Sequence, residues 1–260
     1  MNYELSEWLN LIVRWFHVFV GILWIGQTFL FTWMDRTLDR EESLWLVHSG
    51  GFYIVERQGV PRDLPQILHW FRWEAALTWL SGATLLIIVY YLGGLMDTQV
   101  LGGALISIVV SLVLLTFGWV IYDLLWISPL ARNETAGGIV SFLLFVAVAF
   151  VLTHLMSGRA AYIHVGALLG TFMSANVWLR ILPFQRQMVA AFKKGIPPDI
   201  SLGERAKERT KHNNYMVLTV VLIMISNHFP DATYGNQYNW IVLIALAVVG
   251  GIAANLLRKR

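Results

Sequence analysis

The sequence predicts an all-α integral membrane protein, a seven-transmembrane helix bundle with a small cytoplasmic β-hairpin between the first two helices. Composition is the first reason, because hydrophobic residues make up 57% of the 260 residues and charged residues only 13%. A soluble domain carries about 25% charged residues, so ordinary globular and disordered chains are excluded. The second reason is that apolar runs of roughly 20 residues, the length that crosses a bilayer, recur along the chain. We therefore expect a single polytopic domain, residues 1–260, that has the lipid bilayer as a partner and binds no nucleic acid.

Seven apolar runs can be placed as transmembrane helices. They cover residues 9–33, 67–92, 102–126, 137–156, 161–182, 212–228 and 239–257. The first run contains Trp, Arg and His and is too long for the apolar part of a signal peptide, so we expect it to be retained. The sixth run is the shortest, and we expect the polar stretch 202–211 to form the beginning of the same helix.

Lys and Arg residues are distributed unequally between the two sides of this predicted bundle. Fifteen of them lie in the first, third and fifth connections and in the C-terminal tail, whereas the N-terminus and the other connections hold only Arg159. Cytoplasmic loops of membrane proteins collect Lys and Arg. The distribution therefore predicts an outside N-terminus and an inside C-terminus in a multi-pass membrane protein. An odd number of crossings is required, and seven satisfies it.

Two connections have their own predicted structure. In residues 44–57, two short β-prone runs flank Ser49, Gly50 and Gly51, a glycine turn of the kind that closes a hairpin. Residues 183–211 begin at a proline, continue through the amphipathic run FQRQMVAAFKK, and break at Pro197 and Pro198 before the basic stretch. We interpret this second connection as an interfacial helix with cytoplasmic positive charge.

The chain has no cysteine and seven histidines. The absence of cysteine excludes disulfides, thiolate metal sites, iron–sulfur clusters and covalently attached c-type haem. Ionisable groups are expensive within the hydrocarbon layer and indicate function there. The predicted topology divides the histidines into an outer group, His17, His154, His164 and His228, and an inner group, His48, His69 and His212.

The outer histidines are candidate haem axial ligands. Two imidazoles on neighbouring helices at matching depth are what a bis-histidine haem b needs, so two or more of this group are expected to bind it. His17, Gly21 and Trp24 share one helical face, and Gly21 would leave room for a macrocycle. Zinc or another metal could use the same imidazoles. A histidine near a helix end is also often only interfacial.

The inner residues form two polar groups. In the second predicted helix, His69, Arg72 and Trp73 are expected on one face, with Glu74 beside it. The sixth predicted helix opens with Lys211, His212, Asn213 and Asn214. Such residues can hold a planar polar heterocycle, because they offer cations, amide edges, an aromatic face and a proton acceptor. A solvated helix start is the alternative. Four further residues reach the same predicted side: Tyr122, Asp123, Asn176 and Arg180.

Several stretches together resemble a known family. They are RWFHVFVGILWIG (14–26), LWLVHSGGFYIVER (44–57), LHWFRWEAALTWLSG (68–82), RTKHNNYMVL (209–218) and IMISNHFP (223–230). They are similar to the membrane domain of the PuuD-type, cytochrome c-linked bacterial urate oxidase. The resemblance implies oxidation of urate to 5-hydroxyisourate, with electrons passed to cytochrome c. It also implies a multi-pass protein of the bacterial inner (cytoplasmic) membrane. The family pattern continues into a cytochrome c domain with a Cys-x-x-Cys-His motif, which this chain lacks. Three explanations of this difference are open: the cytochrome c is a separate subunit, the protein uses another electron acceptor, or the chain is truncated.

With this resemblance, the expected site holds a urate anion between the second and sixth helices. Arg72 and Lys211 would offset its charge, and Trp73, Asn213 and Asn214 would bind the ring. His69 or His212 would accept a proton, tuned by Glu74. Electrons would leave through haem b to cytochrome c or a cytochrome-containing subunit. The alternative is a b-type cytochrome subunit of a respiratory complex with no purine substrate; a channel or transporter is disfavoured, because paired broken helices are not apparent.

Overall fold

The computed structural model describes residues 3–61, 63–96 and 103–259, which form a helical bundle and one hairpin. In chain order the elements are α1 (Tyr3–Thr37), β1 (Ser43–His48), β2 (Gly51–Glu56), α2 (Trp73–Leu85), η1 (Leu86–Tyr91), α3 (Ala104–Ile127), η2 (Pro129–Arg132), α4 (Glu134–Leu155), α5 (Gly158–Ala175), η3 (Asn176–Ile181), α6 (Leu182–Lys193), α7 (Ile200–Ile225), η4 (Ser226–His228) and α8 (Asn239–Lys259). η1 and η3 are π-helical, and η2 and η4 are 3₁₀ turns. Arg62, Arg260 and residue 102, where the third predicted span begins, lie outside the described residues.

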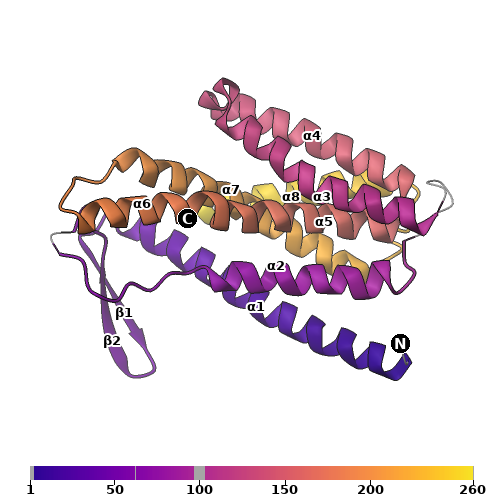
Figure 1. Ribbon diagram of the computed structural model, residues 1–260, viewed down its shortest axis with the longest axis horizontal. Coiled ribbons are helices and arrows are strands. Elements are labelled where there is room, and N and C mark those ends of the chain that lie inside the picture. The colour runs from indigo at the N-terminus through magenta and orange to yellow at the C-terminus, as the bar shows by residue number, and fades with distance from the viewer. Residues whose placement is uncertain (1–2, 62, 97–102, 260) are drawn as a thin grey trace.

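The long helices lie side by side along one axis, with the hairpin at one end and the N-terminus at the other (Figure 1). We call these the hairpin end and the N-terminal end. α5 is central, since it packs against α2, α3, α4 and α7. Small residues in α5 let its neighbours approach closely. Gly166 is an example, because a Cβ built there would lie 2.8 Å from the Met224 Cε of α7.

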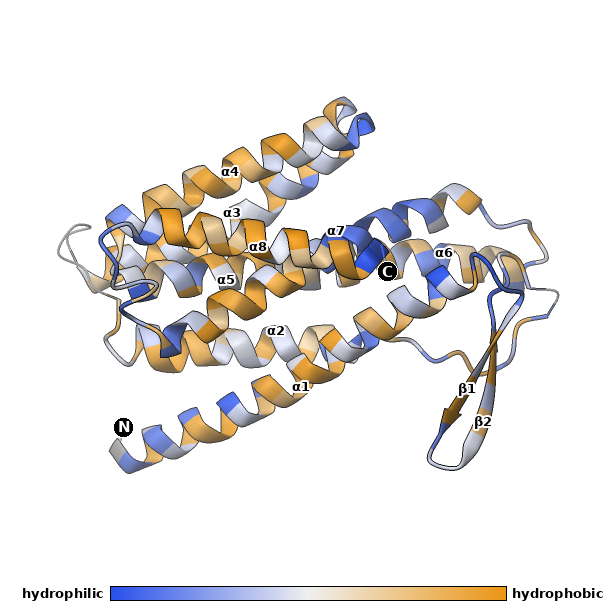
Figure 2. Ribbon diagram, turned by 180° about the vertical axis from the view of Figure 1, so that it is seen from behind, coloured by the Kyte–Doolittle hydropathy of each residue, from blue (hydrophilic) through white to orange (hydrophobic). Residues whose placement is uncertain are grey.

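Six helical segments in the described part of the chain are long and apolar enough to cross a membrane. They are Glu4–Thr37, Trp73–Tyr91, Ala104–Ile127, Glu134–Leu155, Gly158–Lys193 and Asn239–Lys259. Large apolar side chains are exposed along α1, α3 and α4, as lipid-facing helices require. Figure 2 shows α3, α4 and α8 as mostly hydrophobic, whereas the first half of α7 is hydrophilic. The prediction of an all-helical, multi-pass membrane protein is confirmed; the seventh span and the orientation stay predictions.

The segment from residue 158 to 193 corrects one predicted boundary. The fifth helix was expected to end before Pro183, but α5, η3 and α6 run on as one helical stretch of 36 residues. Pro183 is tolerated because it lies in the first turn of α6, directly after the π-helical η3, where a backbone N–H is dispensable. The predicted break at Pro197 and Pro198 is confirmed, as is the helical character of 202–211, since α7 begins at Ile200.

The beginning of α2 corrects a second prediction. α2 starts at Trp73, so His69 and Arg72 precede the helix and do not share a helical face with Trp73. Aromatic packing is the physical reason that the structure offers. The ring of Phe71 lies 4.9 Å from Phe31 of α1, and the ring of His69 lies 4.5 Å from Phe71. These tertiary contacts outweigh a helical preference that is weak for aromatic residues.

The predicted hairpin is confirmed. β1 and β2 pair in antiparallel fashion, with His48 opposite Gly51, so Ser49 and Gly50 form a two-residue turn. Both have positive φ, 50° and 79°, as a type I′ turn requires. Arg57 ties the hairpin to the end of α1, where it donates to the Asp35 carbonyl at 3.2 Å and to Asp39 Oδ1 at 2.5 Å. The hydrogen bond from Arg57 lowers the pKa of the Asp39 carboxyl.

Candidate functional site

Three consecutive polar residues midway along α7 face three different neighbours. Successive residues of an α-helix are rotated by about 100°, so residues 212, 213 and 214 cannot point the same way. Their partners are Tyr122 of α3 for His212, Asn176 of η3 for Asn213, and Thr32 of α1 for Asn214. The polar group that the sequence presented as one set is therefore divided among three interfaces.

The middle interface contains a buried ion cluster, which we define as Asp123, Asn176, Arg180 and Arg209. Arg180 Nε and Arg209 Nη2 each donate to Asp123 Oδ1 at 2.9 Å, and a second nitrogen of Arg180 bonds Asp123 Oδ2. Arg209 Nη1 donates to Asn176 Oδ1 at 3.4 Å. The side chains of Asp123 and Arg209 are only 6% and 5% exposed. A carboxylate shared by two guanidinium groups holds α3, η3 and α7 together.

A hydrogen-bond chain leads from the ion cluster to His212. Asn176 Nδ2 donates to the Tyr122 hydroxyl at 2.9 Å, and Tyr122 Oη lies 2.7 Å from His212 Nδ1. Because the hydroxyl oxygen already accepts from Asn176, the pattern is satisfied when Tyr122 donates its proton to Nδ1. His212 then carries its own proton on Nε2. The ring of Trp126 lies 4.0 Å from that of His212 and limits how it can turn.

Tyr122, His212 and Trp126 line a cavity of about 540 Å³ between α3, α4, α5, α7 and α8. Most of its wall is apolar, with Phe142, Phe145 and Phe172 among the lining side chains. At its polar end Lys211 forms an ion pair with Glu134 of α4. Lys211 and His212 thus face this cavity and not the residues that precede α2.

A second polar group, the α1-side cluster, comprises Gln27, Arg72, Glu74, Trp178 and Asn214. Gln27 Nε2 donates to Glu74 Oε1 at 3.0 Å. The rings of Trp73 and Trp178 lie 5.7 Å apart. Three buried atoms of the cluster have no hydrogen-bond partner in the part of the chain that the structure describes: Arg72 Nε, Trp178 Nε1 and Asn214 Oδ1.

The α1-side cluster surrounds one stretch of α1, residues 24–32. Gln27 bonds Glu74, Phe31 packs on Phe71, and Thr32 accepts a hydrogen bond of 2.9 Å from Asn214. Trp24 and Trp178 pack against the same buried apolar cluster. Glu74 and Asn214 therefore bond this stretch directly, Arg72 and Trp73 lie next to Glu74 in the chain, and His69 is exposed. The structure does not bring His212 or Lys211 there.

The four predicted haem ligands are placed unequally. His164 is fully buried, its Nδ1 lies 2.7 Å from the Ala160 carbonyl, and its Nε2 has no partner among the described residues. His17 Nδ1 lies 2.9 Å from Ser81 Oγ, while Ser81 donates to the Leu77 carbonyl at 2.6 Å. In both histidines the proton is thus on Nδ1 and the Nε2 lone pair is free, as a metal ligand requires. The other two, His154 and His228, are exposed.

His17 and His164 contact α2 and η1 at different heights. Ser81 and Tyr90, their respective neighbours, are nine residues apart, or roughly 13 Å along a helix. We therefore treat them as two independent candidate ligands and not as one pair. Within the described residues, no three His, Asp or Glu side chains gather as a metal site.

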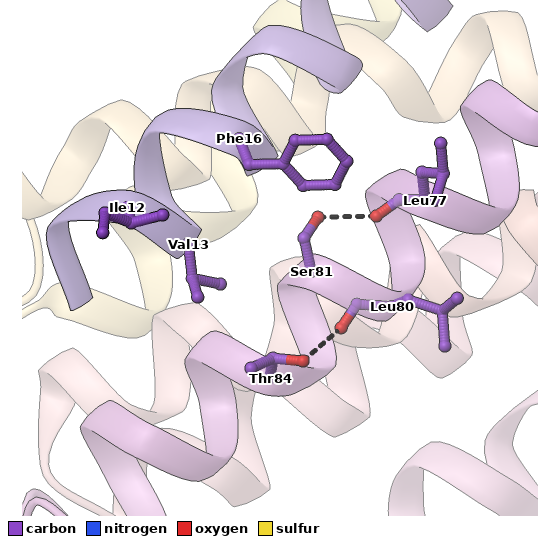
Figure 3. Close-up of a pocket in the computed structure, with 7 residues that line it drawn as sticks. All are labelled: Ile12, Val13, Phe16, Leu77, Leu80, Ser81 and Thr84. Atoms are coloured by element: carbon purple, nitrogen blue, oxygen red, sulfur yellow. Dashed lines mark hydrogen bonds between the residues drawn. The ribbon is translucent and has the colours of Figure 1, made fainter. Parts of the chain in front are cut away.

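A groove of about 320 Å³ lies next to Ser81, between α1 and α2. Figure 3 shows that its two hydroxyl groups are directed at backbone carbonyls of their own helix, Ser81 at Leu77 and Thr84 at Leu80. The remaining lining is apolar. Since neither hydroxyl has its proton free, the groove suits hydrocarbon and offers no chemistry of its own.

Sequence reasoning missed three residues of these clusters and one residue of the cavity. Arg209, Gln27, Trp178 and Glu134 are positions that the sequence presented as loop charge or ordinary span residues. A signal existed for Arg209, because it continues a buried helical stripe with steps of three and four through Ala206, Arg209, Asn213 and Val217. For the other three, no local pattern separates them from their neighbours.

Fold and site together define a multi-pass helical membrane protein whose interior holds two polar clusters and histidines with free ring nitrogens. Such interior polar groups are characteristic of membrane proteins that move protons, electrons or polar substrates. The chain matches the family model described as urate oxidase N-terminal over residues 3–260, and it belongs to that family. Membership gives it a function related to urate oxidation. No curated protein and no solved structure matches the chain.

Proposed function

We propose that the chain oxidises urate to 5-hydroxyisourate and that the α1-side cluster binds the substrate. The observation that carries this proposal is the trio of buried atoms without partners, Arg72 Nε, Trp178 Nε1 and Asn214 Oδ1. An unpaired buried polar atom costs about 1–3 kcal/mol, so a ligand that supplies the partner is bound favourably. Urate is a flat anion with carbonyl acceptors and N–H donors on its edges, which suits two donors and one acceptor.

Each residue of the cluster has a proposed role. The Arg72 guanidinium offsets the charge of the urate anion, and Trp73 and Trp178 offer aromatic faces to the purine. Glu74, held by Gln27, is the proposed proton acceptor, with His69 as the second acceptor at the edge. Asn213 is fixed by Asn176 and the Met173 carbonyl and acts as a positioning residue. Lys211 and His212 have no contact with urate in this proposal.

The reaction balances with an external electron acceptor. Urate and water give 5-hydroxyisourate, two protons and two electrons; the water oxygen forms the new bond to carbon, and Glu74 receives a proton. Haem b would supply one-electron transfer, with His164 and His17 as separate candidate ligands because their Nε2 lone pairs are free. Cytochrome c is the proposed acceptor at the outer face of the bacterial inner membrane. His154 and His228 are left out as ligands because their exposed rings lack a protected site.

The test is urate oxidation by purified protein supplied with oxidised cytochrome c, followed by the loss of urate absorbance. Arg72→Ala is expected to lower kcat/KM by about 10- to 100-fold, because a hydrogen bond to a charged group is worth about 1.5–3 kcal/mol. Arg132→Ala, which removes an exposed arginine of η2, is the matched control and should leave kcat/KM unchanged. Unchanged turnover in Arg72→Ala would contradict the proposed substrate site. A wild-type protein with a haem spectrum but no urate loss would favour the electron-transfer subunit instead.

A further inference from the structure

The cavity beside His212 has one polar end and a long apolar wall. Its volume, about 540 Å³, lies within the range of about 300–1,000 Å³ that is usual for small-molecule sites. The wall includes Phe142, Phe145 and Val148 of α4 and Met216 of α7. Four of the five helices around the cavity, α3, α4, α5 and α8, are long and apolar enough to cross a membrane. A ligand could therefore reach the cavity from the bilayer. An elongated, mostly apolar molecule with one polar group fits this shape.

Two features of the polar end define the head group of that molecule. The His212 ring lines the cavity, and its protonated Nε2 makes no hydrogen bond within the described residues, so the imidazole is a free donor that calls for an acceptor oxygen. Lys211 is already neutralised by Glu134. An anionic head group, such as a carboxylate or a phosphate, would therefore meet no unpaired cation. A neutral carbonyl group matches the donor without requiring one.

Aromatic residues beside this donor favour a flat ring behind the carbonyl. Trp126 lies 4.0 Å from the His212 ring, and Tyr122 stacks on Phe172 at 4.7 Å, so planar surfaces lie at the polar end of the cavity. A membrane quinone has these properties: its head group is a neutral, flat ring that bears carbonyl groups and is attached to an apolar tail. We infer that the cavity between α3, α4, α5, α7 and α8 binds an isoprenoid quinone, whose carbonyl oxygen accepts a hydrogen bond from His212 Nε2.

The quinone is a second acceptor for the electrons of the proposed reaction, and this role rests on the proposed function. Two electrons released from urate and two protons convert the two quinone carbonyl groups into the hydroxyl groups of a quinol. His212 passes its Nε2 proton to one carbonyl oxygen while its Nδ1 takes the hydroxyl proton of Tyr122. Water at the polar end, where Lys211 is part exposed, supplies the proton for the second carbonyl oxygen and the proton that restores Tyr122.

Binding is tested first, with decylubiquinone as the probe and the full-length protein in lipid nanodiscs. Gly138 of α4 lines the cavity, and a Cβ built there meets nothing within 4 Å, so Gly138→Leu fills the cavity without strain. We expect Gly138→Leu to weaken decylubiquinone binding more than tenfold and His212→Leu to weaken it about tenfold. The control is Ile139→Phe on the same turn, where the side chain is 57% exposed on the outer face, and its affinity should equal that of wild type.

Several outcomes would overturn the inference. Equal affinity in wild type and Gly138→Leu would place the quinone elsewhere. Binding of oleate by a wild type that does not bind decylubiquinone would show an anionic lipid site. The acceptor role is judged separately, from urate-dependent quinol formation. If the protein transfers electrons from urate to ferricyanide but not to decylubiquinone, the acceptor role is wrong while the proposed function stands. If it transfers them to neither, the proposed function fails, and the binding result still decides whether the cavity is a quinone site.

Discussion

At the scale of single residues, the two ring nitrogens of a histidine decide whether it can serve as a ligand. His164 has one nitrogen bonded to the carbonyl of Ala160 and the other bare inside the protein, a combination that is costly unless something occupies the bare atom. His154 also has its Nδ1 next to a backbone carbonyl, that of Phe150 at 2.7 Å, but its ring is exposed to the surroundings. The same backbone contact at Nδ1 is therefore found in one histidine with a buried Nε2 and in one with an exposed ring.

This difference gives the first prediction at the residue scale. If the protein binds haem as proposed, His164→Ala is expected to abolish or at least halve the haem absorbance of the purified protein, because it removes the best protected free ring nitrogen. His17→Ala should also reduce it, whereas His154→Ala and His228→Ala should leave it unchanged. Absorption spectra with and without dithionite, normalised to protein, provide the measurement. His164→Gln with an unaltered elution volume separates lost ligation from misfolding; full haem content in that variant would contradict the assignment.

At the scale of helices, one carboxylate holds three elements together. Asp123 of α3 receives hydrogen bonds from Arg180 of η3 and Arg209 of α7, and burial prevents water from replacing them. Such a buried ion pair adds little net free energy of folding, but removal of one partner is costly, since the cations left behind are desolvated and unpaired. The cluster specifies how the three helices are arranged more than it adds net stability.

Removal of this carboxylate should destabilise the bundle. Asp123→Asn is expected to lower the free energy of unfolding by about 3–5 kcal/mol, because two arginines lose their counter-charge at a buried site. Glu134→Gln, at the more exposed ion pair with Lys211, is the control and should change it by no more than about 1 kcal/mol. Thermal unfolding in detergent, followed by circular dichroism, compares the two. A melting temperature for Asp123→Asn equal to that of Glu134→Gln would show that the ion cluster is not structural.

The sequence predicts some of these elements better than others for a physical reason. Span positions and the Ser49-Gly50 turn follow from local properties, the length of an apolar run and the tolerance of positive φ. The beginning of α2 depends on Phe71 packing against Phe31, and the passage of a helix through Pro183 depends on a π-helical turn, so neither is a local property. The predicted depth in the membrane was enough to group four site residues: Tyr122, Asp123, Asn176 and Arg180. Depth does not predict that His212 and Asn214 face different sites, because that depends on which helices pack against α7.

At the scale of the whole molecule, the two ends of the bundle carry different charge. The hairpin end holds Arg57 and the basic first half of α7, while the loop before α8 at the N-terminal end, 229–238, has no Lys or Arg (Figures 1 and 2). This contrast is the basis for predicting an inside hairpin and an outside N-terminus, because α1 begins at the N-terminal end and both α1 and α8 end at the hairpin end.

The natural absence of cysteine makes this orientation directly measurable. Glu42→Cys marks the hairpin end, and Asp231→Cys marks the N-terminal end; both positions are exposed. A membrane-impermeant maleimide is expected to label Asp231→Cys in spheroplasts and Glu42→Cys only after lysis. The cysteine-free parent serves as the blank. The reverse labelling would refute the predicted orientation, and labelling of both before lysis would refute an odd number of crossings.

The middle of α7 couples the two sites of the protein. His212 and Asn214 lie within one rigid helical turn, yet one faces the cavity and the other faces the α1-side cluster. Because the turn is rigid, both side chains move when the helix rotates. A ligand in the cavity that rotates α7 by a few degrees therefore also shifts Asn214 in the α1-side cluster, so that binding at one site is coupled to binding at the other.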